Sequence, residues 1–140
     1  MNRQPTSDGL EVVNQALPLS GTVLVVEDEE SLRLAVCTVL RKKGFSVIEA
    51  ANGSEAMDLV RLHQNGIDLI LLDLTLPGVS SREIFQEAQR LRPEMKVIPT
   101  SAHNKETVDT SLAGLRVERF IRKPFQLADL VRLLQQALSD

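Results

Sequence analysis

Two kinds of hydrophobic pattern alternate along the chain from residue 22 onward. Short apolar runs are typical of strands that are buried on both faces, whereas apolar residues three and four positions apart are typical of helices that pack on one side. The runs predict strands over 22–26, 45–50, 67–72, 97–100 and 117–121. The helical spacing predicts a helix after each strand, over 32–43, 56–65, 80–91, 107–113 and 127–138.

Turn and cap residues support the ends of these elements. Basic residues 41–43 followed by Gly44 form a typical helix stop. Ser80 and Glu83 have the spacing of a capping box, and Pro93 follows the helix that they begin. The helix predicted for 107–113 is the weakest by its pattern.

The alternation of strands and helices indicates βαβ units, which build a parallel sheet with helices on both faces. Right-handed crossovers leave few ways to connect the strands. We predict one α/β domain over residues 22–140: a single doubly wound five-stranded parallel sheet of order 2-1-3-4-5, in a flavodoxin-like, three-layer α/β/α arrangement. Residues 1–21 are polar and rich in turn residues, and we predict an N-terminal extension or linker there.

The composition is that of a globular protein and excludes several function classes. The 140 residues are 43% hydrophobic and 25% charged, which argues against a disordered chain. The formal net charge of -3 gives no broad cationic surface, so we expect no nucleic-acid binding. One cysteine and two histidines exclude an internal disulfide and argue against a zinc site. No apolar run reaches the ~18 residues of a membrane span, so we expect a cytoplasmic domain without membrane contact.

Acidic residues follow two of the predicted strands. Glu27 and Asp28 come directly after the first strand, and Asp73 closes the third. In the order 2-1-3-4-5 these strands are neighbours, and the carboxyl ends of parallel strands share one edge of the sheet. Two carboxylates about 5 Å apart repel by roughly 3 kcal/mol at an effective dielectric near 20, so three in one pocket need a cation. Oxygen ligands at a solvent-open site favour Mg2+.

A hydroxyl and an amine are expected at the same edge. Ser101 follows the fourth strand and Lys123 follows the fifth, while Thr100 is a rival to Ser101 as the hydroxyl that points into the site. Carboxylates, a divalent cation, an ammonium group and a hydroxyl together are typical of a phosphoryl-transfer site. Asp73 is central among them and is the candidate nucleophile, which would form an aspartyl phosphate.

Four segments at the predicted strand ends resemble the receiver domain of two-component response regulators. They are 25–29 (VVEDE), 72–78 (LDLTLPG), 101–102 (SA) and 123–125 (KPF). Each is a weak motif alone, but the four occur in the family's order, and the resemblance covers residues 22–140.

The resemblance implies a phosphoacceptor site. Asp73 would take phosphate from the phosphohistidine of a histidine kinase. Glu27 and Asp28 resemble the acidic pair that holds Mg2+ together with the phosphoacceptor. The backbone carbonyl of Thr75 resembles the third protein ligand of that ion.

The resemblance also implies a conformational switch. Ser101 resembles the hydroxyl residue that turns inward to bond the phosphoryl group, and Lys123 resembles the lysine that pairs with it. Phe120 stands where the family places an aromatic switch residue; without a hydroxyl, it can signal only by moving between buried and exposed positions. Such a domain catalyses its own phosphorylation and dephosphorylation, and we expect a signalling switch rather than an enzyme.

Residues 112–123 differ from the commonest receiver pattern and resemble receivers at the C-terminal end of hybrid sensor histidine kinases. A hybrid-kinase receiver is therefore preferred, with a stand-alone single-domain regulator as the alternative. The implied partner is a histidine kinase or a phosphotransfer domain. A homodimer through the face of the fourth helix, fifth strand and fifth helix is a further partner arrangement that the resemblance allows.

Two other functions stay open at this point. A phosphatase of the haloacid dehalogenase type also uses an Asp nucleophile and Mg2+. Such phosphatases resemble one another in an Asp-x-Asp motif at the nucleophile, and here Thr75 stands in place of the second Asp. A receiver-like binding module that is never phosphorylated would keep the fold without the chemistry. Incorporation of phosphate, its catalytic release, or neither would separate the three functions.

Overall fold

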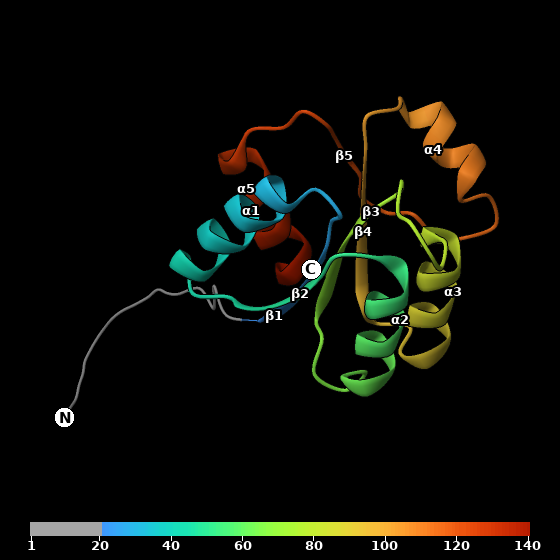
Figure 1. The fold of residues 1–140 in the computed structure, drawn as a ribbon, viewed down its shortest axis with the longest axis horizontal. Coiled ribbons are helices and arrows are strands. Elements are labelled where there is room, and N and C mark those ends of the chain that lie inside the picture. The colour runs from blue at the N-terminus through green and yellow to red at the C-terminus, as the bar shows by residue number, and fades with distance from the viewer. Residues whose placement is uncertain (1–20) are drawn as a thin grey trace.

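Five parallel strands form one sheet in the order β2-β1-β3-β4-β5, which confirms the predicted fold class (Figure 1). The computed structural model describes residues 21–140. The strands are β1 (Thr22–Val26), β2 (Ser46–Ala50), β3 (Leu69–Asp73), β4 (Lys96–Ser101) and β5 (Ile121–Arg122). The helices are α1 (Glu30–Lys42), α2 (Gly53–Leu62), α3 (Ser81–Leu91), α4 (Lys105–Ser111) and α5 (Leu127–Ser139). Residues 1–20, which make up nearly all of the predicted N-terminal extension, lie outside the described residues.

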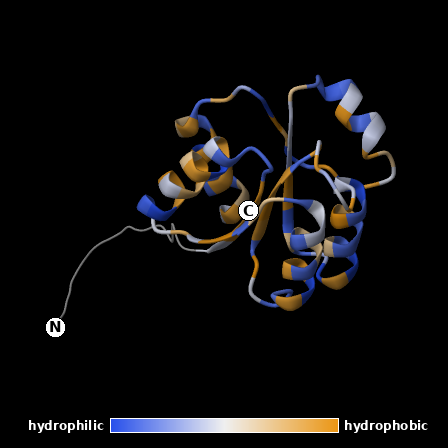
Figure 2. Cartoon of the chain, viewed as in Figure 1, coloured by the Kyte–Doolittle hydropathy of each residue, from blue (hydrophilic) through white to orange (hydrophobic). Residues whose placement is uncertain are grey.

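The central strands are buried on both faces, as their continuous apolar runs predict. Along β1, Val23 and Val25 pack with α1 and α5, whereas Leu24 and Val26 pack on the other side with α2, α3 and α4. Figure 1 shows the helices in these two layers, and Figure 2 shows hydrophobic residues along the strands and as stripes on the helices. The predicted three-layer arrangement is therefore confirmed. Within residues 21–140, no helix has the length and apolar character needed to cross a membrane.

Two predicted helix ends are confirmed by local geometry. At the start of α3, the Ser80 hydroxyl accepts a hydrogen bond from the Glu83 N–H (3.2 Å), and the Glu83 carboxylate accepts one from the Ser80 N–H (3.3 Å). After α1, Gly44 has a φ of 98°, a conformation that disfavours any side chain. Both ends follow from neighbouring residues alone, which is why the sequence pattern located them.

The fifth strand is shorter than its apolar run predicts. The sequence predicts a strand over 117–121, but β5 spans only Ile121–Arg122, and residues 117–120 are not part of any strand. The register pairs Thr100 with Ile121 and Ser101 with Arg122, and it ends there. The prediction is therefore wrong for 117–120, and the cause lies in the neighbouring strand.

Pro99 of β4 explains where β5 begins. Successive residues of a parallel strand form hydrogen bonds alternately with the strands on either side. The Thr100 carbonyl accepts from the residue after β3, and the Ser101 carbonyl accepts from Lys123 after β5 (2.8 Å). Pro99 therefore faces β5, as Ser101 does, and it has no N–H to donate. The ladder between β4 and β5 thus lacks one hydrogen bond at this position, next to the point where the register ends.

Side chains of α3 hold residues 111–116, which lead into the segment that β4 leaves unpaired. The Arg82 guanidinium donates to the carbonyl oxygens of Ser111 (3.1 Å) and Ala113 (2.7 Å), at the end of α4. The Gln89 amide donates a longer bond to the Arg116 carbonyl (3.5 Å). These contacts are exposed to solvent, so they hold the segment less firmly than a sheet ladder would.

Candidate functional site

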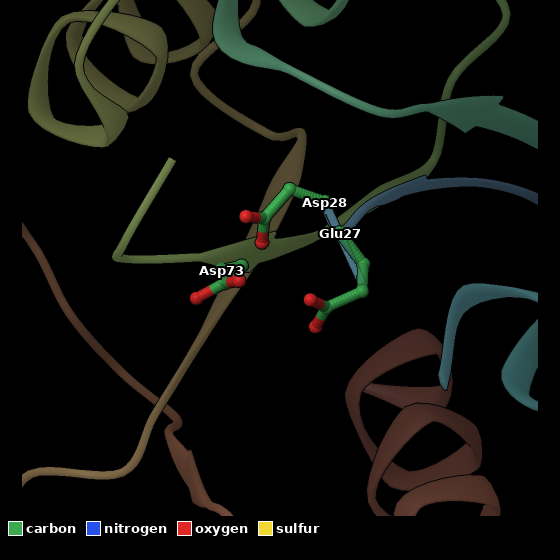
Figure 3. A group of neighbouring side chains, drawn as sticks. All are labelled: Glu27, Asp28 and Asp73. Carbon is green, nitrogen blue, oxygen red and sulfur yellow. The ribbon is translucent and has the colours of Figure 1, made fainter. Parts of the chain in front are cut away.

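The ends of β1 and β3 bring three acidic side chains together. The register pairs Val26 with Leu72, so the residues that follow, Glu27 and Asp73, are neighbours. Oxygen atoms from the carboxylates of Glu27, Asp28 and Asp73 all lie within 4.8 Å of one another. Figure 3 shows the three side chains around one space at the ends of the two strands. The acids thus meet where the strand order places them.

The three carboxylates differ in their exposure to water. Asp73 is the last residue of β3 and is only 1% exposed, Glu27 is 6% exposed, and Asp28 is exposed. Burial raises the pKa of the Glu27 carboxyl, and a hydrogen bond from Lys123 partly opposes this effect. Two buried carboxylates beside each other therefore need positive charge close by.

Lys123 supplies that charge from the end of β5. Its ammonium nitrogen lies 2.7 Å from Glu27 Oε1 and 3.2 Å from Asp73 Oδ2. Burial works against the charge of Lys123, but the Glu27 hydrogen bond and the two carboxylate charges outweigh it and raise the pKa of the ammonium group. Lys123 is followed by a cis peptide bond to Pro124. The lysine is thus a cation shared between two acids.

The two oxygens of the Asp73 carboxylate have different surroundings. Oδ1 accepts hydrogen bonds from the backbone N–H (3.0 Å) and the hydroxyl (3.1 Å) of Thr75. Oδ2 is buried and accepts no hydrogen bond; Lys123 is close enough for an ion pair but lacks hydrogen-bond geometry. One oxygen therefore fixes the orientation of the carboxylate, and the other is left to form a new bond.

The site has the donor set of a divalent-ion centre. All three ligands that could hold an ion are carboxylates, and oxygen donors are the preference of hard cations such as Mg2+. Asp73 Oδ2 is a buried anionic atom without a hydrogen-bond donor, which a cation would satisfy. The exposed Asp28 leaves this edge open to water, as Mg2+ requires because it keeps part of its hydration shell.

No hydrogen bond joins Ser101 to the three acids, and Phe120 has no polar group that could form one. Ser101 is buried, and its hydroxyl accepts a hydrogen bond from the His103 N–H (3.0 Å). Phe120 is half-buried and packs against the core beneath α2, α3 and α4. Thr100, the rival hydroxyl, is buried as well. The roles predicted for Ser101 and Phe120 stay predictions.

An apolar hollow lies beside the acids, between the start of α1 and the loop after β5. It has a volume of about 500 Å3. Lys123 lines it and so joins the hollow to the acidic cluster. The other lining residues are Glu29, Ser31, Leu32, Ala102, Pro124 and Phe125. This surface can receive an apolar group next to the carboxylates.

The sequence pattern missed two residues that hold the backbone of the site. The Ser81 hydroxyl donates to the Asp73 carbonyl oxygen (2.5 Å), and the Arg33 guanidinium donates to the Glu27 carbonyl oxygen (2.9 Å). Both donors belong to helices, where spacing indicates only which face is buried. A polar residue in the first turns of a helix that follows a site strand is the one signal that could have located them.

A model of the response regulator receiver domain matches residues 23–135. The match covers the five strands except Thr22, the first residue of β1, and it covers all the candidate site residues. The family recognised from four short motifs in the sequence is therefore the one that the whole-domain comparison finds.

Two curated relatives illustrate how such domains occur. The chain is 30% identical over 129 residues to the sensor kinase CckA of Brucella abortus, which covers 91% of this chain and 14% of that protein. It is 32% identical over 117 residues to the sensory transduction protein RegX3 of Mycolicibacterium smegmatis, which covers 84% of this chain and 50% of that protein. The chain thus spans half or less of the length of these relatives.

A solved structure agrees with this comparison. The receiver domain of the hybrid histidine kinase CckA superimposes with a TM-score of 0.71 at 28% identity, covering 84% of this chain and 99% of that one. The likeness therefore extends over the whole of the compared domain.

Proposed function

This chain belongs to the response regulator receiver domain family, and from that premise we propose that it is the phosphoacceptor switch of a two-component phosphorelay, with Asp73 as the acceptor. Receiver domains are signalling switches rather than classical enzymes. The observation that carries the proposal is the Asp73 carboxylate, which is buried, fixed through one oxygen by Thr75, and at the other oxygen has no hydrogen bond and only the Lys123 ammonium beside it. A plain structural aspartate would have both oxygens satisfied.

The proposed reaction is transfer of a phosphoryl group from a phosphohistidine. Asp73 Oδ2 donates an electron pair to phosphorus and forms a P–O bond, while the P–N bond breaks and its electron pair stays on the imidazole nitrogen of the donor, which takes up a proton. The product is an aspartyl phosphate, a mixed anhydride. Attack of water on it releases inorganic phosphate and a proton and restores the carboxylate.

We propose that the carboxylates of Glu27, Asp28 and Asp73 and the backbone carbonyl of Thr75 hold Mg2+ at this site. When bound, the ion neutralises the phosphoryl oxygens and the acids that surround them. Glu27 and Asp28 then serve as ligands and take no proton. Lys123 contributes a second positive charge, already fixed beside Asp73 Oδ2.

The switch would run from the phosphoryl group toward α4. We propose that the Ser101 hydroxyl turns from the His103 N–H to donate to the phosphoryl group, and that Lys123 pairs with the same group. Movement of Ser101 would vacate space for Phe120, which would pass from its half-buried position to a buried one. Each state of the protein would then present a different α4–β5–α5 face to a partner, including a second copy of the chain.

The partner that supplies phosphate is a histidine kinase or a phosphotransfer domain, as for receiver domains in general. The apolar hollow beside Lys123 supports docking of such a donor, since Leu32, Pro124 and Phe125 could pack against the helix that carries its phosphohistidine. A donor charged from ATP implies a cytoplasmic location, and the acidic site gives nucleic-acid phosphates no counter-charge.

We further propose that the chain is the receiver part of a hybrid kinase, because the likeness to CckA extends over 91% of the chain. A stand-alone single-domain regulator is the second candidate; RegX3 is similar at 32% identity, but the chain covers only 50% of that protein. Reading the native gene on both sides of the encoded segment distinguishes the two.

Incubation of the chain with acetyl phosphate, with and without Mg2+, tests the proposed function. Intact-mass spectrometry should show one added phosphoryl group in the presence of Mg2+, none in its absence, and none for Asp73→Asn. Asp68→Asn is the matched control, because Asp68 lies at the opposite end of β3. Incorporation that persists in Asp73→Asn would refute the assignment. Continuous release of phosphate would indicate a phosphatase, and no incorporation an inert binding module.

A further inference from the structure

We propose that Arg33 is a positioning residue for the divalent-ion site, because it fixes the peptide that joins Glu27 to Asp28. The proposal rests on the ion site of the proposed function and adds a residue that contacts none of the carboxylates of that site. Arg33 lies on α1, and its guanidinium donates to the Glu27 carbonyl oxygen (2.9 Å).

Both main-chain groups of Glu27 are held by other elements. Its N–H donates to the Ala50 carbonyl of β2 (3.1 Å), and its carbonyl accepts from Arg33. The carbonyl lies past the end of β1, where no ladder bond holds it. Removing Arg33 would therefore take away the hydrogen bond that holds the carbonyl of the Glu27–Asp28 peptide, and this peptide could rotate while the preceding one stays bonded to β2.

Asp28 depends most on this peptide. Among residues 21–140, no hydrogen bond or ion pair holds its carboxylate, whereas Glu27 is held by Lys123 and Asp73 by Thr75. Only its own backbone and rotamer direct the Asp28 carboxylate toward the other acids. Since the Asp28 backbone begins at the peptide that Arg33 holds, rotation of that peptide would swing the carboxylate away from the ion position.

Arg33 is itself held in place. Its side chain is 15% exposed, and its Nε atom lies 3.4 Å from Glu49 Oε1 on β2. Glu49 also pairs with Arg41 at 3.1 Å, and Arg41 makes no contact with Glu27. Arg41 is thus a matched control: it is an arginine of the same helix that is paired with the same acid but does not reach the site backbone.

Positioning and simple electrostatics predict opposite results. Arg33 carries a positive charge near a cation site, so removal of that charge alone would strengthen Mg2+ binding. Loss of positioning would weaken it, and groups behind the metal ligands typically change affinity by about 10–100-fold. Replacement by lysine keeps the charge but loses the planar geometry that reaches both Glu27 and Glu49.

The test is Mg2+ titration of the full chain, followed by amide chemical shifts of the residues around Asp73. Arg33→Gln should weaken Mg2+ binding about tenfold, and Arg33→Lys should weaken it by a smaller factor. Arg41→Gln should stay within twofold of the wild type. Urea unfolding of each variant shows whether it is folded, and the lysine variant carries the test if Arg33→Gln is not.

The outcomes separate the two proposals. If the wild type binds Mg2+ and the Arg33 variants bind it equally well or more tightly, positioning by Arg33 is refuted and the ion site stands. If Arg41→Gln weakens binding as much as Arg33→Gln does, the effect does not depend on the hydrogen bond to the Glu27 carbonyl, and positioning is refuted. If the wild type itself shows no saturable binding, the ion site of the proposed function is overturned.

Discussion

The two edges of β4 differ in how firmly they are paired. Toward β3, the ladder runs from Leu69–Lys96 to Asp73–Thr100, and every residue of β3 is buried. Toward β5, the ladder consists of two residue pairs; Ile121 is half-buried and Arg122 is exposed. Asp73, the proposed acceptor, thus belongs to the firmly paired side, while Phe120, the proposed switch residue, lies just before the weakly paired strand.

This difference suggests that the firmly paired side of the sheet serves the chemistry and the weakly paired side serves the conformational switch. Chemistry at Asp73 needs fixed distances, and a strand buried on both faces provides them. A switch needs two arrangements of similar free energy, and a segment held by a few exposed side-chain bonds can provide those. Because Pro99 has no N–H to donate toward β5, the change from firm to weak pairing occurs at β4, between its β3 edge and its β5 edge.

Truncation of one apolar side chain in β3 and one in β5 should give the largest difference between the two strands in lost free energy of unfolding. Ile70→Ala in β3, where the side chain is fully buried, should lower the free energy of unfolding by about 3 kcal/mol. Ile121→Ala in β5, where the side chain is half-buried, should lower it by about 1 kcal/mol. Because the chain has no Trp or Tyr, urea unfolding is followed by far-ultraviolet circular dichroism. Equal losses would show that the two strands are equally well packed.

Introducing a backbone N–H at position 99 should make the pairing of β4 with β5 more like its pairing with β3. Pro99→Val adds the N–H that β4 lacks toward β5, and one new backbone hydrogen bond should raise the free energy of unfolding by about 1 kcal/mol. Hydrogen exchange at Ile121 should slow at the same time. Ile98→Val changes a neighbouring side chain but adds no donor toward β5, and should show neither gain. A Pro99→Val protein with unchanged exchange at Ile121 would contradict the explanation given for the short strand.

Removing the Arg82 hydrogen bonds from α3 should increase the mobility of the chain before β5 but not that of β1 and β3. Arg82→Gln loses the bonds to Ser111 and Ala113, so amides over 111–118 should exchange faster, while those of β1 and β3 stay unchanged. The global free energy of unfolding should fall by only about 0.5 kcal/mol, since the bonds are exposed. Arg90→Gln is the control on the same helix. Faster exchange throughout the sheet would show that the two regions unfold as one unit.

The smallest effect concerns a charge cluster at the surface, formed by side chains of α2 and α3. Hydrogen bonds from Arg90 and Arg61 lower the pKa of the Glu87 carboxyl to about 2. A lowered folded-state pKa stabilises the fold above the unfolded value of 4.5, and this contribution is lost as the pH falls toward 2. Glu87→Gln should therefore be less stable than wild type at pH 6 and equal to it near pH 2. The difference should be small and should shrink in salt, because both arginines are exposed.

Local patterns predicted most of the fold because each signal acts over a few residues. The apolar runs marked β1 and β3, and the Ser80–Glu83 pair marked the start of α3. The meeting of Glu27 with Asp73 also followed from sequence, because parallel strands in the order 2-1-3-4-5 leave the acids no other edge to occupy. The candidate chemistry was therefore visible before the structure.

What only the tertiary structure decided depends on residues that are distant in the sequence. The start of β5 is set by Pro99, whose missing N–H matters only because it faces that strand. Arg33 and Ser81 hold the site backbone through contacts whose direction depends on how α1 and α3 lie against the sheet. Periodicity identifies the buried face of a helix, but which carbonyl a polar side chain reaches is determined by packing, and packing exists only in the folded chain.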